Sequence, residues 1–380
     1  WDREWYLTYE QFRLRLVDLV DHLLDLMENE PDFKYFNLDG QGIILEDYLA
    51  FRPENEERLR RLIQEGRITI GPWYVLNDEF LVSGESTVRS LLMGHKVVRE
   101  FGPVMKVGYL PDQFGNISQM PQILRNFGID NCIFGRGWQV QGDRKMEFNW
   151  VAPDGSHVLS SLMNFWYNNA QDIPTDEEAG RRWVEDMAGR MKAVSGSRHL
   201  LFMNGVDHLE PQYSLPDALA HIDPVIEDNL IHSRLTDYVD ALRQEAASGA
   251  LKPGEHVGEL REDRWSSILS GVLSARIYLK QANERCMRVL EKYAEPASTW
   301  ASLIPVPSDA PKAKAGAGAG FKYPSGELDY AWKLLMQNHP HDSICGCSTD
   351  EVHDEMVPRF MRVEQLGDQL AERAMRYIAD

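Results

Sequence analysis

The sequence predicts an α/β protein in which a mainly parallel sheet, closed or nearly closed into a barrel, is followed by a helical bundle. Strand-like and helix-like runs alternate up to about residue 261, which implies βαβ units. After about residue 262 the pattern is helical. The chain has 380 residues, more than one hydrophobic core usually covers, so we expect a barrel domain at 1–261 and a bundle domain at 262–380.

Local signals in the first part place its elements. Residues 8–29 are expected to form an amphipathic helix that begins with a capping box of Thr8 and Gln11. Gly128 gives the helix expected at 118–128 a left-handed end. Short apolar runs predict strands at 33–38, 67–75, 104–110, 131–136, 157–164 and 199–207, helices are expected at 53–66, up to Phe101 and at 175–194, and a strand-then-helix step covers 229–247.

The second part reads as helices separated by a polar and a Gly/Ala-rich segment. Helical patterns cover 266–295 and 328–337, and a last helix is expected to begin near Asp350. Between them, residues from about 308 to 325 contain too few apolar side chains to pack, so this segment is predicted to be a flexible loop.

Charge and composition exclude several function classes. The formal net charge of −19 argues against nucleic acid or an anionic membrane as the main partner. No apolar run approaches the ~20 residues that span a bilayer. Four cysteines are too few and too scattered for a disulfide framework, which favours a reducing, cytoplasmic location. The chain opens with WDREWY, so we expect that processing or truncation has removed its natural start.

Three aspartates stand out as candidates for catalysis. Asp112 and Asp207 each follow a predicted strand directly, and Asp2 lies in the opening WDREW. A single such aspartate is most often a helix cap or turn residue. Two carboxylates on one rim can instead divide acid and base work. In retaining glycoside hydrolysis such a pair stands ~5 to 5.5 Å apart. Aromatic residues that could stack on a sugar, or simply pack in the core, are Trp5, Trp73, Phe114, Trp138 and Trp166.

The segment NHPHDSICGC, which starts at Asn338, contains several metal-binding residue types. One interpretation is a local structural zinc site of His341, Cys345, Cys347 and His353, although the one-residue gap in CGC fits such sites poorly. Another makes His341 one ligand of a site that distant carboxylates complete. A third is a polar turn whose histidines are satisfied by hydrogen bonds. Spacing alone leaves the three open.

Longer motifs resemble a known family. The stretches WDREWY, DGQGIILEDYL, GRITIGPWYVLNDEFLVSGE, GYLPDQFGNISQMPQILRNFGI, MNGVDH and NHPHDSICGCSTDEVH occur in the order found in family 38 of the glycoside hydrolases, the zinc-dependent α-mannosidases, and are most similar to its bacterial branch. The resemblance implies a seven-stranded β/α barrel and then a three-helix bundle. The family's C-terminal β-rich domains would be missing from this chain.

The resemblance also implies a role for individual residues. It makes Asp112 both the nucleophile and a zinc ligand, Asp207 the general acid/base, Asp2 and His341 zinc ligands, Trp5 and Phe114 sugar contacts, Arg136 a neighbour of the nucleophile, and Asp342 a partner of a mannose hydroxyl. The family's fourth ligand is a histidine two positions before the aspartate of WDREW. That position falls just before Trp1 and is not in this sequence.

The implied function is retaining hydrolysis of terminal α-D-mannosides, with one Zn²⁺ binding the 2- and 3-hydroxyls of the sugar. Two alternatives remain at this stage. The chain could be a truncated, inactive or merely sugar-binding fragment of such an enzyme, or a metal-dependent barrel deacetylase. Relatives often self-associate, so the resemblance also allows a homo-oligomer.

Overall fold

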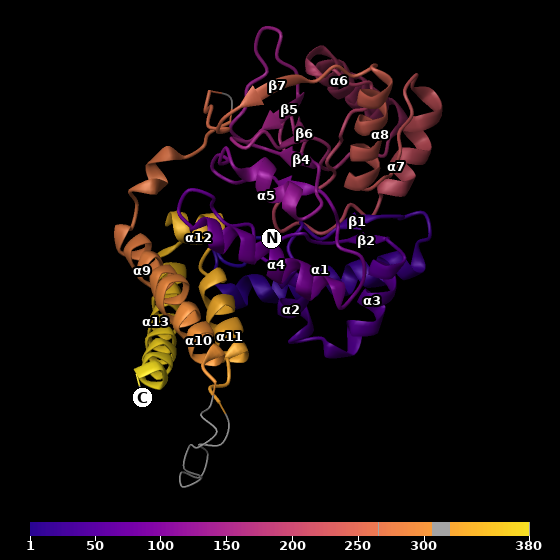
Figure 1. The fold of residues 1–380 in the computed structure, drawn as a ribbon. Coiled ribbons are helices and arrows are strands. Elements are labelled where there is room, and N and C mark those ends of the chain that lie inside the picture. The colour runs from indigo at the N-terminus through magenta and orange to yellow at the C-terminus, as the bar shows by residue number, and fades with distance from the viewer. Residues whose placement is uncertain (265, 306–319, 380) are drawn as a thin grey trace.

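A computed structural model describes residues 1–264, 266–305 and 320–379, and it has the mixed α/β fold that the sequence predicts (Figure 1). In these residues the strands form two sheets, one of two strands and one of five in the order β3-β4-β6-β5-β7. The β5–β6 pair is antiparallel and the other pairs are parallel. The strands are β1 (Phe36–Asn37), β2 (Ile68–Thr69), β3 (Gly108–Leu110), β4 (Asn131–Phe134), β5 (Glu147–Val151), β6 (His157–Leu162) and β7 (Gly254–Val257).

Helices accompany both sheets. Figure 1 shows α1 to α4 gathered beside β1 and β2, and α6 to α8 beside the five-stranded sheet. The capping box expected at Thr8 and Gln11 starts α1, whose apolar face is buried. The helices of this part are α1 (Tyr9–Asn29), α2 (Ile43–Leu49), η1 (Pro53–Asn55), α3 (Glu56–Gln64), α4 (Gly84–Arg99), α5 (Met120–Asn126), α6 (Glu177–Val194), α7 (Leu215–Ile222), η2 (Asp223–Val225) and α8 (Leu235–Ser248).

Two of the predicted strands are absent, and two unpredicted strands are present. Within 199–207 and 229–233 the described chain has no strand, whereas β5 and β7 were not expected. At 199–207 the side chain of Asn169 and the backbone of Ala170 bind backbone groups that a neighbouring strand would otherwise bind. Asn169 accepts from the Met203 N–H at 2.7 Å and donates to the Leu201 carbonyl at 3.1 Å. These backbone groups are therefore satisfied without sheet pairing.

The C-terminal part is helical, as predicted, but its first helix is interrupted. Leu269 and Arg276 have left-handed backbones, with φ of 48° and 44°. Arg276 is held there by the Gly346 carbonyl at 3.1 Å and by Asp350 at 2.7 Å. The elements are η3 (Ser270–Leu273), α9 (Ile277–Arg288), the π-helical η4 (Val289–Ala294), α10 (Glu295–Leu303), α11 (Ser325–Met336), α12 (His341–Cys345) and α13 (Asp350–Ala379).

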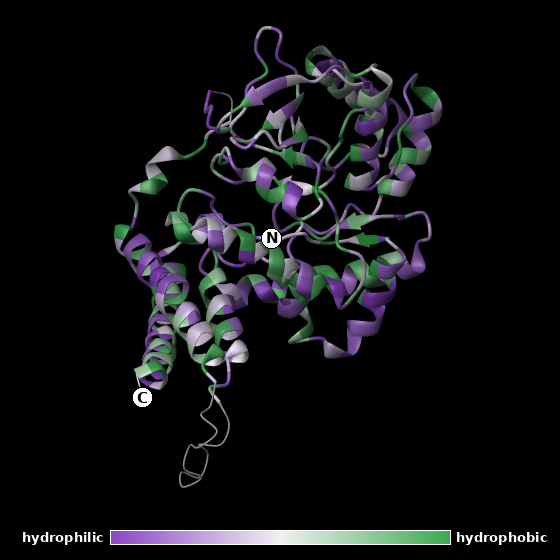
Figure 2. Ribbon diagram, in the orientation of Figure 1, coloured by the Kyte–Doolittle hydropathy of each residue, from purple (hydrophilic) through white to green (hydrophobic). Residues whose placement is uncertain are grey.

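The C-terminal helices share a hydrophobic core with the N-terminal part. One cluster of buried residues joins side chains of α1 to α4 with side chains of α9, α11 and α13. Figure 2 shows the corresponding hydrophobic stripes on these helices, with hydrophilic residues on their other sides. This packing carries α12, and with it His341, to the N-terminal part. Most of the predicted flexible loop, residues 308–319, lies outside the described residues.

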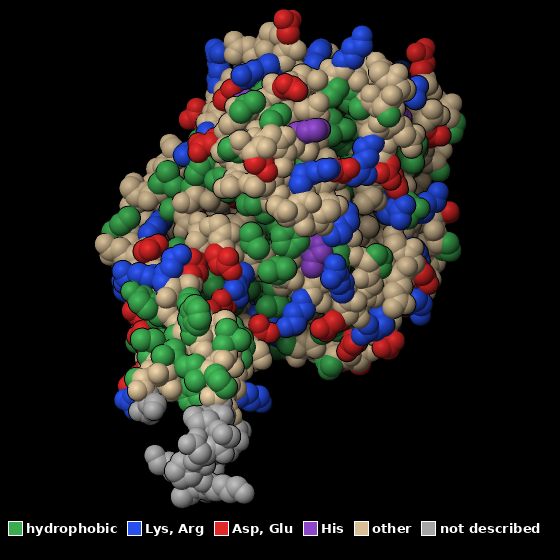
Figure 3. Space-filling view, viewed as in Figure 1, with side chains coloured by type: hydrophobic (Ala, Val, Ile, Leu, Met, Phe, Trp, Pro, Cys, Tyr) green, Lys and Arg blue, Asp and Glu red, His purple; other side chains and the backbone are tan. Residues whose placement is uncertain are grey.

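The surface mixes both signs of charge. Figure 3 shows acidic and basic side chains interspersed over one face, and hydrophobic side chains gathered over the C-terminal helices. Exposed apolar residues on α10 and α11 include Trp300, Leu303 and Tyr330. None of the helices in the described ranges combines the length and the apolar character that crossing a membrane would require.

Candidate active site

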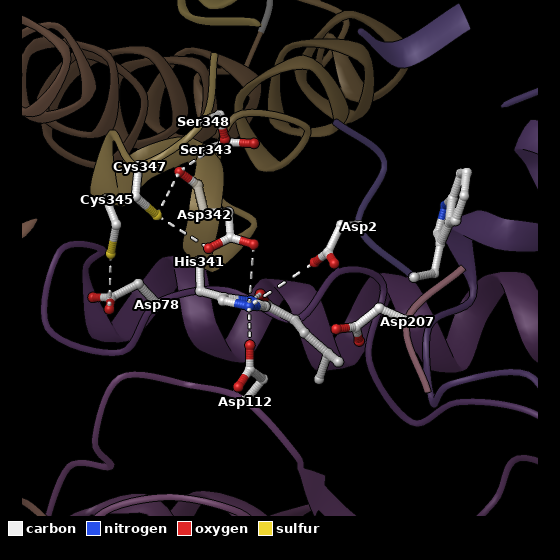
Figure 4. Close-up of polar contacts among 12 residues, drawn as sticks. Asp2, Asp78, Asp112, Asp207, His341, Asp342, Ser343, Cys345, Cys347 and Ser348 are labelled. Carbon is white, nitrogen blue, oxygen red and sulfur yellow. Dashed lines mark hydrogen bonds and ion pairs between the residues drawn. The ribbon is translucent and has the colours of Figure 1, made fainter. Parts of the chain in front are cut away.

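His341 is the centre of a cluster of carboxylates that come from three parts of the chain. Its Nε2 lies 3.2 Å from Asp112 Oδ2, 3.7 Å from Asp342 Oδ2 and 3.9 Å from Asp2 Oδ1. Figure 4 shows these groups pointing toward the imidazole. Burial alone would lower the pKa of His341, but Asp342, Asp112 and Asp2 raise it to about 10. The cluster therefore favours a positive charge at its centre.

The imidazole is oriented by the chain that precedes α4. The Leu76 carbonyl accepts from the His341 backbone N–H at 3.1 Å and lies 3.3 Å from His341 Nδ1. A histidine that donates from Nδ1 to a carbonyl leaves Nε2 as the nitrogen available to a metal. The backbone of Asp78 also donates to the His339 carbonyl, at 3.2 Å. Residues 76–78 thus fix the position of the α11–α12 turn, which carries His341, relative to the other residues of the site.

Asp2 is positioned by its two following neighbours, whose side chains point in different directions. Arg3 pairs with Asp47 of α2 at 2.7 Å, and both side chains are buried. Glu4 is fully buried and pairs with Arg359 of α13 at 2.5 Å. One neighbour is therefore anchored to the N-terminal part and the other to the last helix. The two anchors fix the backbone that directly follows Asp2.

Asp112 and Arg136 follow two neighbouring parallel strands, β3 and β4. Arg136 Nε donates to Asp112 Oδ1 at 2.7 Å. The close approach of the two loops requires a glycine at position 135, because a Cβ there would lie 1.9 Å from the Pro111 carbonyl oxygen. Burial would raise the pKa of Asp112, but His341 and then Arg136 outweigh burial and lower it. Asp112 is held as a carboxylate.

Asp207 has the opposite electrostatic character. Burial, and then the charge of Asp2, raise its pKa, while Tyr167 donates a hydrogen bond to its Oδ2 at 3.2 Å. Asp207 lines a pocket of about 330 Å³ together with Asp2, Asp112 and His341. The pocket therefore holds one carboxyl group whose pKa is lowered and another whose pKa is raised, the difference that acid/base pairs require.

Two other predicted residues, Phe114 and Asp342, lie directly against His341. Phe114 is buried and meets the His341 ring edge-on, with centroids 5.3 Å apart. Trp5 packs against Tyr6 with ring centroids 5.0 Å apart and is not among the residues that line the pocket. Asp342 lies beside His341 and accepts from the Cys347 thiol at 3.1 Å. Burial raises the pKa of Asp342 to about 6.

The donor set suits a divalent metal ion. Asp2, His341 and Asp342 each offer one ligand atom, and these atoms lie within 4.8 Å of one another. Asp112 approaches the same imidazole nitrogen. Carboxylate and imidazole are zinc ligands. A local zinc site in the CGC segment fits less well, because Cys345 donates to Asp78 at 3.3 Å and His353 Nε2 lies 3.1 Å from the Ser348 carbonyl.

Tyr167 and His208 line this pocket and contact predicted site residues, but the sequence did not predict them. Tyr167 donates to Asp207, and nothing in the spacing around Tyr167 indicates it. His208 lies 3.6 Å from Asp2 Oδ2 and stacks on Phe12 with ring centroids 4.0 Å apart. Burial lowers the pKa of His208 to about 4. His208 could have been identified from the sequence, because it directly follows Asp207 in the motif MNGVDH.

Comparisons with known proteins agree along the whole chain. Residues 1–259 match the model of the glycosyl hydrolases family 38 N-terminal domain, and residues 267–378 match that of the alpha-mannosidase middle domain. A Halalkalibacterium halodurans protein, provisionally named a mannosylglycerate hydrolase, is 42% identical over 378 residues, which are 96% of this chain and 40% of that protein. Human alpha-mannosidase 2C1 is 26% identical over 92% of this chain and 31% of its own length.

A solved structure shows the same relationship. The crystal structure of an alpha-mannosidase from Enterococcus faecalis V583 superposes with a TM-score of 0.90 at 40% identity, over 100% of this chain and 42% of that one. The chain thus spans about two-fifths of the length of these two bacterial relatives. Activities named for the longer proteins belong to those proteins.

Proposed function

Because the chain belongs to family 38 of the glycoside hydrolases, we propose that it hydrolyses terminal α-D-mannosides with retention of configuration and with one bound Zn²⁺. Family membership and the names of the relatives support the glycosidase class and the mannoside substrate. The residues of the pocket support the other two parts of the proposal, the retaining mechanism and the zinc ion. The observation that carries it is the convergence of Asp2, Asp112 and Asp342 on His341.

The proposed metal ligands are Asp2, Asp112 and His341, with the family's further histidine placed before Trp1. Their residue types and their approach to His341 Nε2 fit a zinc ion. When bound, such an ion would grip the sugar's adjacent 2- and 3-hydroxyls and favour mannose, whose 2-hydroxyl is axial. Asp342 then accepts a hydrogen bond from a mannose hydroxyl, while Trp5 and Phe114 border the sugar.

Asp112 is the proposed nucleophile. Its lowered pKa keeps it ionised, and the Arg136 hydrogen bond on Oδ1 fixes the direction of the carboxylate. Attack by Asp112 on the anomeric carbon forms a glycosyl-enzyme ester as the bond to the leaving oxygen breaks. Asp207, with its raised pKa, holds the proton that the leaving oxygen takes. Asp207 then removes a proton from the water that hydrolyses the ester.

The family also supports a finer description of the architecture than the strand assignments alone. We propose that residues 1–261 form the family's seven-stranded β/α barrel and that residues 262–380 form its three-helix bundle. The packing of α9, α11 and α13 on the N-terminal core supports this division, whereas the strands of the described residues form separate sheets of two and five, with one antiparallel pair. In this arrangement the bundle delivers His341 and Asp342 to the barrel rim.

Zinc content and turnover of p-nitrophenyl α-D-mannoside test the proposal. Both are to be measured on the chain of 380 residues and on the same chain extended by His-Thr-His before Trp1, which supplies the remaining histidine of the family pattern. We expect stoichiometric zinc and mannose release in the extended chain, with weaker binding in the shorter one. Zinc-loaded protein that releases no mannose from any α-mannoside would contradict the proposed function.

A further inference from the structure

The pocket beside Asp112 and Asp207 extends to helix α1, where Arg15 lines its wall. The charged side chains of this wall are mostly acidic. Its acidic side chains are Asp2, Asp39, Asp112, Asp207 and Glu210, and its lysine or arginine side chains are Arg15 and Arg234. An anionic substrate would therefore meet strong repulsion in this pocket unless a cation faced it.

Arg15 differs from the other charged groups in its partners. Arg234 pairs with Asp237 at 2.7 Å, and Glu210 lies 3.0 Å from His22. Among the described residues, no carboxylate forms an ion pair with Arg15. Its hydrogen bond runs from Nη1 to the Tyr6 hydroxyl at 3.4 Å. The remaining guanidinium N–H groups stay available to a ligand, since arginine offers five donors.

A short series of contacts connects Arg15 to the proposed metal ligands. The Tyr6 hydroxyl lies 3.4 Å from His208 Nδ1, and His208 Nε2 lies 3.6 Å from Asp2 Oδ2. The His208 ring is fixed by its stack on Phe12. Its Nε2 is buried without a hydrogen-bond partner in the described structure. Arg15 thus lies two side chains away from Asp2.

We propose that Arg15, with the Tyr6 hydroxyl beside it, binds an anionic oxygen group of the substrate. The group would be a carboxylate on the aglycone or a phosphate on the sugar, both of which a guanidinium binds through paired hydrogen bonds. This inference rests on the proposed function and makes its substrate class more specific. The 42% identical relative is named for a mannoside of glycerate, which carries a carboxylate. Exposed arginines commonly contact water alone, but this one lines the pocket and has no acidic partner.

Calorimetric binding to the chain of 380 residues with Asp112→Asn, which prevents turnover, tests the inference. The ligands are mannosylglycerate and mannosylglycerol, which differ in one carboxylate, and methyl α-mannoside with and without a 6-phosphate. We expect one of the anionic ligands to bind about tenfold or more tightly than its neutral counterpart. The pair that shows the preference identifies the source of the anion. Arg15→Gln should bring that ratio near one, and Arg15→Lys should restore part of it.

Arg182→Gln serves as the matched control, since Arg182 is an exposed arginine of α6 outside the pocket. It should leave the ratio unchanged. The inference is overturned if neither anionic ligand is preferred, if no ligand binds, or if Arg15→Gln keeps the preference. Turnover of the neutral p-nitrophenyl α-mannoside by the chain with native Asp112 is read separately. Its absence would count against the proposed function, whereas the binding ratio would still decide the role of Arg15.

Discussion

His341 and Asp112 lie 229 positions apart in the chain, and yet His341 Nε2 is 3.2 Å from Asp112 Oδ2. The contact joins the first residue of the short helix α12 to the loop that follows strand β3. Because Arg136 binds the other oxygen of the same carboxylate, Asp112 is held from two sides. Its ionisation and its direction are therefore set before any substrate arrives.

The first prediction concerns this carboxylate. Asp112→Asn should lower kcat for p-nitrophenyl α-mannoside by about 10⁴-fold or more, because an amide is a poor nucleophile toward the anomeric carbon. Turnover is measured together with the melting temperature, so that loss of fold is separated from loss of chemistry. A folded variant with full activity would remove Asp112 from the role of nucleophile.

The second prediction concerns Asp207. Asp207→Ala should slow release of a poor leaving group by about 10²- to 10⁴-fold, the usual contribution of a general acid. With a dinitrophenyl mannoside, the rate of the first step should fall much less, because the leaving oxygen of this substrate needs no proton. Equal losses for both substrates, measured by pre-steady-state release of the phenol, would be inconsistent with an acid role.

The same residue predicts a pH dependence. The pKa of Asp207 is raised by burial and by Asp2, so its proton persists above the ordinary range of an aspartate. Activity that needs this proton is present at low pH and declines as the pH rises through the raised pKa. In Asp207→Ala the alkaline decline of kcat/KM should disappear. An unchanged alkaline limb in that variant would assign the decline to another group.

A third prediction concerns the anchor of Asp2. Arg359→Met leaves Glu4 buried without its ion pair, so the free energy of unfolding should fall by about 3 to 5 kcal/mol. The double variant Arg359→Met with Glu4→Gln should lose less free energy of unfolding than the sum of the two single changes, because it has no uncompensated buried charge. Chemical denaturation measures all three variants. The exposed Arg376→Gln on the same helix should stay within about 0.5 kcal/mol of the native chain.

A fourth prediction uses Gly135. A methyl group at this position meets the Pro111 carbonyl, so Gly135→Ala should destabilise the chain by about 1 to 3 kcal/mol and should move the Asp112 loop. Gly189→Ala is the control, because Gly189 lies inside α6 with open space around it, and alanine favours a helix by about 0.5 to 1 kcal/mol. If both variants had the same stability and turnover, the close packing at Gly135 would be of no consequence.

The sequence was informative where the physical cause is local. The capping box at Thr8 marked the start of α1, and the mixed α/β class followed from alternating patterns. Segment 199–207 has the composition of a strand, but the side chain of Asn169 binds the Met203 N–H and the Leu201 carbonyl. No local sequence pattern identifies Asn169 as that partner. The left-handed backbone at Arg276 likewise depends on contacts with Gly346 and Asp350.

In the site, too, residues marked by local sequence patterns could be predicted, and residues placed by tertiary contacts could not. Asp112 could be singled out because it follows a predicted strand that the structure contains, β3. Asp207 was singled out by the same argument, but the described residues form no strand directly before it. Composition and spacing left the metal interpretation of His341 open, and only the resemblance to long motifs connected it with Asp2. Tyr167 and Arg15 reach the pocket through tertiary packing, so periodicity and spacing could not identify them.

A crystallographic anomalous difference map at the zinc edge, from protein soaked or grown with zinc, tests the account most directly. We predict one peak about 2.0 to 2.2 Å from His341 Nε2 and from carboxylate oxygens of Asp2 and Asp112. A peak at the cysteines of the CGC segment instead, or none near His341 in zinc-saturated crystals, would contradict the shared metal site.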